Sequence, residues 1–134
     1  MIQFKAMYPL YVCEDLEAQS SFYTENFGFQ AMFFDPNFYL HLIDVNKGVQ
    51  VGFMLPDLAA QPQFLRAKAV TDGIVLSFEV ANAKEAYAQA QKQGLDIHFK
   101  LREESWQQTH FMVRDPAGLI LDIVEDRNQL SVSG

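Results

Sequence analysis

Three histidines and one aspartate are the side chains with the strongest potential for chemistry in this sequence. His41, His98 and His110 each lie in a run of apolar residues typical of a strand, and Asp122 lies in a further such run, 118–126. Since every second residue of a strand points to one face, we expect His110 and Asp122 to lie side by side on neighbouring strands. An imidazole beside a carboxylate can bind a metal or form a hydrogen-bonded buried pair.

His41 stands between two leucines and is expected on the same side as His110, although a shift of one residue would reverse its facing. His41, His110 and Asp122 would then form a candidate centre for a divalent metal such as zinc, iron or manganese. The alternative is a pair of satisfied polar side chains without a metal. His98 is expected at a surface or edge position.

Nucleophilic chemistry finds no support in the sequence. Cys13 is the one cysteine, and its apolar surroundings indicate a buried small side chain. Ser20, Ser21 and Ser77 have no base at a recognisable spacing. No nucleophile elbow, phosphate-binding loop, Cys-x-x-Cys motif or dinucleotide fingerprint occurs.

The elements that must position these residues occur twice in the same order. Each half contains a strand, a capped helix ended by a glycine, and three further strands. The first half is predicted as strand 5–13, helix 16–27 after Asp15, and strands 29–35, 38–44 and 48–56. The second half is predicted as strand 73–80, helix 83–93 after Asn82, and strands 95–103, 109–115 and 118–126.

This repeat predicts an α+β fold of two tandem βαβββ modules in a single domain. One module of roughly 65 residues cannot bury both faces of its sheet. We therefore expect curved mixed sheets around a cleft, with the helices on the convex face. The predicted boundaries are module one 1–56, a connection 57–72 with a short helix within 58–69, module two 73–127, and a C-terminal tail 128–134.

Composition limits the kinds of partner. A chain of 134 residues with 49% apolar residues has the size and core of one soluble domain. A net charge of −7 argues against nucleic acid and weakly favours a neutral or cationic ligand. We see no signal peptide and no apolar run long enough for a membrane span, so a cytoplasmic protein that binds no membrane is expected.

Two segments carry a resemblance to a known family. Residues 8–29, YPLYVCEDLEAQSSFYTENFGF, resemble the opening of the vicinal oxygen chelate superfamily, which comprises glyoxalase, bleomycin-resistance and extradiol-dioxygenase proteins. Residues 113–126, VRDPAGLILDIVED, resemble its Arg-Asp-Pro-x-Gly turn and final strand. The segment before that turn is similar to a subgroup with Glu-x-Trp-Gly-Gln, here Glu104, Trp106, Gln107 and Gln108.

The resemblance implies a metal site whose usual ligands this chain has lost. Enzymes of the family hold a divalent metal through His on the first strand and Glu on the last strand of each module. The matching positions here are Tyr8, Gly52, Val75 and Asp122. Tyrosine is a rare ligand for such ions, and valine and glycine side chains have no donor atom. Only Asp122 is a plausible ligand, so we expect no cofactor.

Strand alternation predicts the lining of the cleft. Trp106 is either a buried structural side chain or an aromatic wall for a flat ligand, and Gly52 either leaves room for a ring or marks a bulge. Arg114 is expected to pair with a nearby carboxylate and to order the turn that follows it. The predicted cleft residues are Tyr8, Leu10, His41, Gln50, Gly52, Met54, Ser77, Glu79, Trp106, His110, Met112 and Asp122.

The leading hypothesis is a metal-free protein that binds a small organic or antibiotic-like molecule, as relatives that sequester bleomycin do. The alternative is a metal-dependent lyase, isomerase or dioxygenase with an atypical His/Asp centre. A third hypothesis is an interaction module without chemistry, with a filled cleft and an exposed apolar patch. The resemblance implies a homodimer in each case, swapped or unswapped.

Overall fold

The computed structural model describes residues 1–127. The chain divides into two compact units, with the boundary between Val70 and Thr71. This boundary falls inside the predicted connection 57–72. The predicted tail 128–134 lies outside the described residues.

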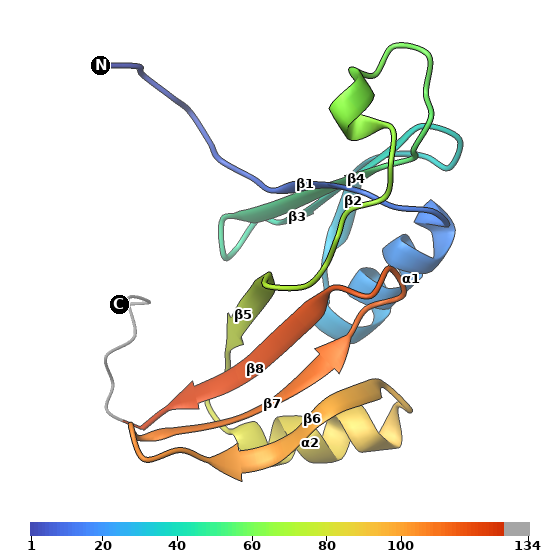
Figure 1. The fold of residues 1–134 in the computed structure, drawn as a ribbon. Helices are drawn as coiled ribbons and strands as arrows, with labels where there is room; N and C mark the ends of the chain where they lie inside the picture. Colours follow the sequence, from blue (N-terminus) through green and yellow to red (C-terminus); the bar gives the residue numbers. More distant parts are fainter. Residues whose placement is uncertain (128–134) are drawn as a thin grey trace. The chain divides into compact units, whose positions relative to one another are not determined.

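Unit 1 is one four-stranded sheet with a helix (Figure 1). The helix α1 (Leu16–Phe27) begins after Asp15, whose Oδ1 accepts a hydrogen bond from the Ala18 amide at 3.1 Å, and ends at Gly28, where φ is 74°. A 3-10 turn, η1 (Gln63–Leu65), stands where a short helix was predicted. The sheet order is β1-β4-β3-β2, formed by β1 (Leu10–Val12), β2 (Gln30–Asp35), β3 (Tyr39–Asp44) and β4 (Val49–Met54).

Unit 2 repeats this arrangement. Its helix α2 (Ala83–Lys92) begins after Asn82, whose Oδ1 accepts from the Glu85 amide at 3.0 Å. In both sheets the first strand pairs in parallel with the last, and the other neighbours are antiparallel. The order is β5-β8-β7-β6, formed by β5 (Val75–Glu79), β6 (Asp96–Glu103), β7 (Gln108–Arg114) and β8 (Ile120–Asp126). The α+β fold of two βαβββ modules is therefore confirmed.

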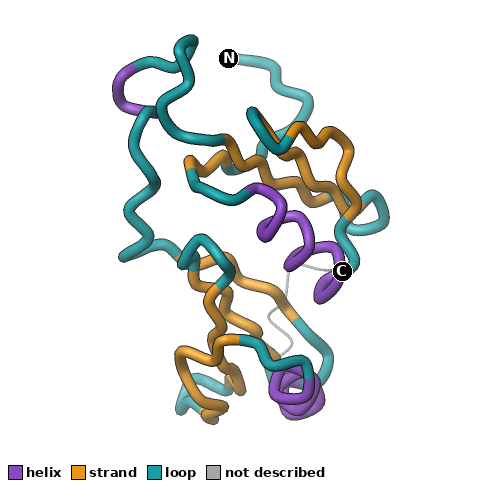
Figure 2. Tube along the Cα trace, turned by 90° about the vertical axis from the view of Figure 1, so that its right-hand side faces the viewer, coloured by secondary structure: helices purple, strands orange, loops and turns teal. Residues whose placement is uncertain are grey.

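Each unit buries one face of its sheet under its own helix, and Figure 2 shows the two helices along the two sheets. In unit 1, Tyr23 of α1 is fully buried and its ring stacks on Phe53 of β4 at 5.6 Å. In unit 2, Tyr87 of α2 contacts Phe111 of β7 edge to face at 5.0 Å. Because side chains alternate along a strand, the residues between these core positions lie on the face away from the helix.

Two strands show the main differences from the predicted elements; the bounds of the others agree within two residues. The strand predicted at 5–13 is only Leu10–Val12, because residues before it make no ladder in the described structure. Strand β6 has register shifts between Ile97 and Phe99 and between Phe99 and Arg102, so its alternation is broken. Among the described residues, no helix combines the length and the apolar character that crossing a membrane requires.

Candidate functional site

His41 lies on the sheet face of unit 1 away from α1, and both of its ring nitrogens have partners. Nδ1 lies 2.7 Å from the Tyr39 hydroxyl, and Nε2 lies 2.7 Å from Oε1 of Gln50. The Tyr8 ring meets the imidazole edge to face, with centroids 4.5 Å apart. His41 is 4% exposed, and three side chains of its own unit hold its ring in place.

Gly52 pairs with His41 in the register of β3 and β4, and the space above it is filled. A Cβ at this position would overlap the Tyr39 hydroxyl and would lie 3.1 Å from Tyr39 Cζ. The space that a side chain at position 52 would need is therefore occupied by the ring of the protein's own Tyr39. Burial, and then the nearby Tyr8, raise the pKa of the Tyr39 phenol, which keeps it protonated.

His110 lies on the corresponding face of unit 2, between two carboxylates. Its Nδ1 is 2.8 Å from Asp122 Oδ1, and its Nε2 is 2.8 Å from Glu104 Oε2. Burial opposes the charged imidazole, but the hydrogen bonds to Glu104 and Asp122 outweigh burial and raise the pKa of His110. Hydrogen bonds from His110 and then Arg102 lower the pKa of Glu104.

Glu104 and its surroundings are the part of this cluster that sequence reasoning missed. Arg102 donates to Glu104 Oε2 through Nε at 3.1 Å and Nη2 at 2.9 Å, and its guanidinium lies 4.5 Å from the centre of the Phe99 ring. Glu104 belongs to the motif that was singled out, but nothing in that motif indicates that it faces His110. Trp106 is 57% exposed, so its interpretation as a buried side chain is wrong; its indole N–H donates to Gln108.

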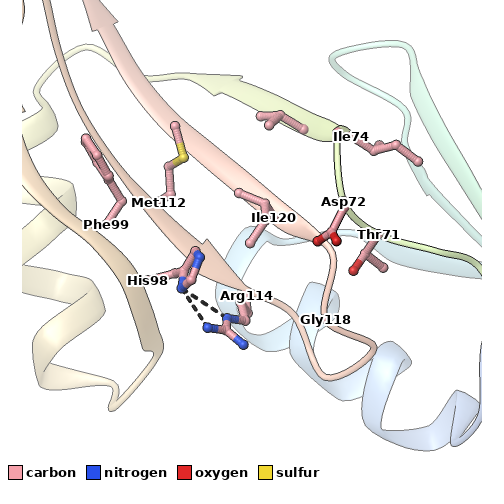
Figure 3. A pocket seen from close by; sticks show the side chains of 11 residues that line it. Thr71, Asp72, Ile74, His98, Phe99, Met112, Arg114, Gly118 and Ile120 are labelled. Atoms are coloured by element: carbon pink, nitrogen blue, oxygen red, sulfur yellow. Dashed lines mark hydrogen bonds between the residues drawn. The ribbon is translucent and has the colours of Figure 1, made fainter.

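A pocket of about 440 Å³ opens in unit 2, on the sheet face away from α2 (Figure 3). Its apolar wall takes one side chain from each of the four strands: Val75 of β5, Phe99 of β6, Met112 of β7 and Ile120 of β8. This volume is within the range of small-molecule sites. The remaining lining residues are Thr71, Asp72, Gly73, Ile74, His98, Arg114 and Gly118.

Arg114 lies beside a carboxylate, as predicted, but its hydrogen bonds go to His98. It donates to His98 Nδ1 through Nη2 at 2.7 Å and Nε at 3.2 Å, while the nearest carboxylate oxygen, on Asp96, is 4.0 Å away. The turn is ordered instead by Asp115, whose Oδ1 accepts from the amides of Ala117 at 2.9 Å and Leu119 at 3.0 Å. The prediction that Arg114 orders the turn is therefore wrong.

The structure distributes the predicted cleft residues over the two units. Met112 alone among them lines the pocket of unit 2, and His98, predicted at the surface, is exposed and also lines it. His98 and Phe99 are consecutive yet line the same pocket, because the register shift in β6 interrupts alternation. Unit 1 holds Tyr8, Leu10, His41, Gln50, Gly52 and Met54, and unit 2 holds Ser77, Glu79, Trp106, His110, Met112 and Asp122.

The donor atoms at the expected metal positions do not fit a divalent ion. Gly52 and Val75 have no donor, and Asp122 already accepts His110 at 2.8 Å. Within residues 1–127, no group of three or more His, Cys, Asp and Glu side chains is placed to hold a metal. His41 and His110 would each have to give up a hydrogen bond to become a ligand.

Comparison with known proteins identifies the family. A sequence model described as "Glyoxalase/Bleomycin resistance protein/Dioxygenase superfamily" matches residues 6–123. The chain therefore belongs to the glyoxalase/bleomycin resistance/dioxygenase superfamily, as its resemblance indicated. No curated protein matches the chain in a sequence search.

Solved structures of the superfamily have the same fold. A lactoylglutathione lyase from Agrobacterium tumefaciens is similar with a TM-score of 0.74 and 17% identity, over 96% of this chain and 98% of that one. A glyoxalase/bleomycin resistance protein/dioxygenase from Nocardioides also has a TM-score of 0.74, with 16% identity over 100% and 91%. A superfamily member from Sphaerobacter thermophilus DSM 20745 has a TM-score of 0.72 and 22% identity over 93% and 99%. At these identities the likeness shows the fold alone.

Proposed function

We propose that this chain is a metal-free member of the superfamily that binds a small organic molecule on the open sheet face of unit 2. The observation that carries the proposal is Val75. It stands at a position that the resemblance assigns to a metal ligand, and it forms part of the wall of the 440 Å³ pocket. A side chain without donor atoms, 46% exposed in such a pocket, favours contact with an apolar ligand surface over metal binding.

The remaining polar side chains support the same proposal. His110 is satisfied by Asp122 and Glu104, and His41 by Tyr39 and Gln50, so neither imidazole needs a metal to complete its bonding. Binding without chemistry agrees with the absence of a nucleophilic motif in the sequence.

A thermal-shift screen tests this proposal. The full chain, purified without added metal, is mixed with small aromatic compounds, with bleomycin, and separately with Zn²⁺, Fe²⁺ and Mn²⁺. We expect at least one organic compound to raise Tm in a concentration-dependent manner and no metal to do so. Stabilisation by a metal with none by any organic compound would overturn the proposal.

The alternative is a metal-dependent lyase, isomerase or dioxygenase, and its nearest structural basis is the cluster of Glu104, His110 and Asp122. The two carboxylates contact opposite ring nitrogens of His110, so a metal would require these side chains to rearrange. Elemental analysis decides between the metal-free binding protein and the metal-dependent enzyme. A metal content below roughly 0.2 equivalents per chain after reconstitution excludes a bound metal centre. A stoichiometric metal content supports the enzyme. A homodimer and a cytoplasmic location remain predictions under both functions.

A further inference from the structure

The pocket of unit 2 has polar side chains on two sides of its apolar wall. Figure 3 shows the His98 ring and the Arg114 guanidinium joined by hydrogen bonds on one side, and Thr71 and Asp72 on the other side of Ile120. The pocket therefore offers a ligand one cation, Arg114, and one carboxylate, Asp72, on either side of Ile120. These two groups restrict the charge that a ligand can carry.

Arg114 is oriented before any ligand arrives. Its Nε and Nη2 both donate to His98 Nδ1, at 3.2 Å and 2.7 Å. Nη1 of Arg114 has no hydrogen-bond partner in the described part of the chain. The second N–H of Nη2 and the two of Nη1 form the edge of the guanidinium that matches a carboxylate in forked geometry.

Asp96 does not satisfy this guanidinium. Its Oδ2 lies 4.0 Å from Nε, and the Asp96 and Arg114 side chains are 67% and 46% exposed. An exposed ion pair at this distance contributes little and is screened by salt. The Arg114 charge is therefore available to a ligand whose body is held by the apolar wall.

Asp72 restricts the ligand further. It is exposed at the rim of the pocket and makes no ion pair or hydrogen bond in the described part of the chain. A second carboxylate on a ligand in this pocket would add to the negative charge of Asp72, which is unfavourable. The net charge of −7 suggested a neutral or cationic ligand. However, charges beyond about 8–10 Å are screened by salt. The groups that line the pocket therefore determine which ligand charge is preferred.

We propose that this pocket binds a small monocarboxylate with an aromatic or aliphatic body, its carboxylate on Arg114 and its body on Val75, Met112 and Ile120. The polarisable Met112 thioether suits a ring of varied outline. This ligand class rests on the proposed function, since it takes the pocket to be the binding site.

The test titrates the full chain with phenylacetate, phenylacetamide and 2-phenylethylamine, followed by calorimetry or amide chemical shifts. We expect phenylacetate to bind roughly tenfold or more tightly than either matched compound, because a charged hydrogen bond is lost in both. 4-Carboxyphenylacetate, with a second carboxylate at the far end, is expected to bind more weakly than phenylacetate.

Three variants separate the ligand class from the function. Arg114→Gln should reduce phenylacetate affinity by roughly tenfold or more, while Arg127→Gln, an arginine outside the pocket, should leave it unchanged. Val75→Trp fills the pocket and should abolish binding of every probe, with folding checked by circular dichroism.

Equal binding of all three compounds, unaffected by Arg114→Gln but abolished by Val75→Trp, overturns the monocarboxylate assignment and retains the proposed function. Binding of phenylacetate unchanged in Val75→Trp overturns the pocket itself and therefore both proposals.

Discussion

The ionisation of His110 is controlled by the two carboxylates that hold its ring. Burial opposes its charge, but Glu104 and Asp122 at 2.8 Å raise its pKa above the ordinary value of a histidine. Arg102 also contacts Glu104 and lowers the pKa of that carboxyl together with His110. The fold therefore stabilises the charged imidazolium of His110, between its two carboxylates, relative to a free histidine.

We therefore predict that the pKa of His110 in the folded protein is higher than that of a model histidine. Its stabilising contribution is fully present below the unfolded pKa of about 6.5 and is lost as pH rises through the raised folded pKa. An NMR titration of the imidazole should show the higher midpoint, and Glu104→Gln should lower it because one hydrogen-bonded carboxylate is removed. The difference in Tm between wild type and His110→Gln should shrink from about pH 6 to about pH 9. A wild-type midpoint at or below that of a model histidine would contradict the assignment.

Gly52 supports a second prediction at the scale of one residue. A glycine-to-alanine change in an ordinary backbone conformation gains about 0.4–1 kcal/mol through the unfolded state. Here the new methyl group overlaps the Tyr39 hydroxyl, which is fixed by its 2.7 Å bond to His41. Overpacking costs about 1–3 kcal/mol, so the clash should win and Gly52→Ala should be destabilising in urea unfolding.

Tyr39→Phe is the matched background for this change. Without the hydroxyl the nearest atom to the new methyl is Cζ at 3.1 Å, which a small ring movement relieves. Gly52→Ala should therefore cost less in the Tyr39→Phe background than alone. An equal cost in both backgrounds would show that the hydroxyl is not the obstacle.

At the scale of the element, local signals proved readable from the sequence. Asp15 and Asn82 begin the two helices as predicted, because a cap is a contact between residues three positions apart. The pocket was not readable, because it depends on register. The shift between Ile97 and Phe99 brings two consecutive side chains, His98 and Phe99, to one pocket, which strict alternation forbids.

The contact between Glu104 and His110 escaped sequence reasoning for a related reason. Glu104 follows the end of β6 at a turn in which Gln107 has a φ of 69°, a left-handed conformation that favours glycine. Glutamine at position 107 does not indicate such a turn, although the similar family motif has glycine at this position. The conformation of that turn determines which way a side chain beyond the end of the strand points, and the residue types alone do not specify this conformation.

Asp115 provides a prediction for the β7–β8 turn. Asp115 is 4% exposed, and its carboxylate accepts from the amides of Ala117 and Leu119, which fixes the chain where it enters β8. Asp115→Ala leaves these amides without their acceptor and should lower the free energy of unfolding by about 1–3 kcal/mol. Asp115→Asn keeps an acceptor oxygen and should cost less. An alanine variant as stable as wild type in urea would contradict this role of Asp115.

At the scale of the whole molecule, the edge strand β2 bears on self-association. It is the last strand in its sheet, so one side of its backbone is unpaired within unit 1. Several large apolar side chains on it and on the turn after it are also open to solvent. They are Met32 at 60%, Phe33 at 49%, Phe34 at 40% and Phe38 at 45% exposure.

These features lead us to predict a homodimer held in part by β2. Burial of aromatic side chains favours association, whereas a charge of −7 on each chain opposes it at long range. Light scattering should give twice the 15.3 kDa chain mass, and added salt should strengthen the dimer by screening the repulsion. Phe33→Glu should shift the mass towards the monomer, while the same change at Phe64, which is 83% exposed on η1, should leave it unchanged. A wild-type monomer at all salt concentrations, or a dimer indifferent to Phe33→Glu, would show that the exposed β2 side chains have another role.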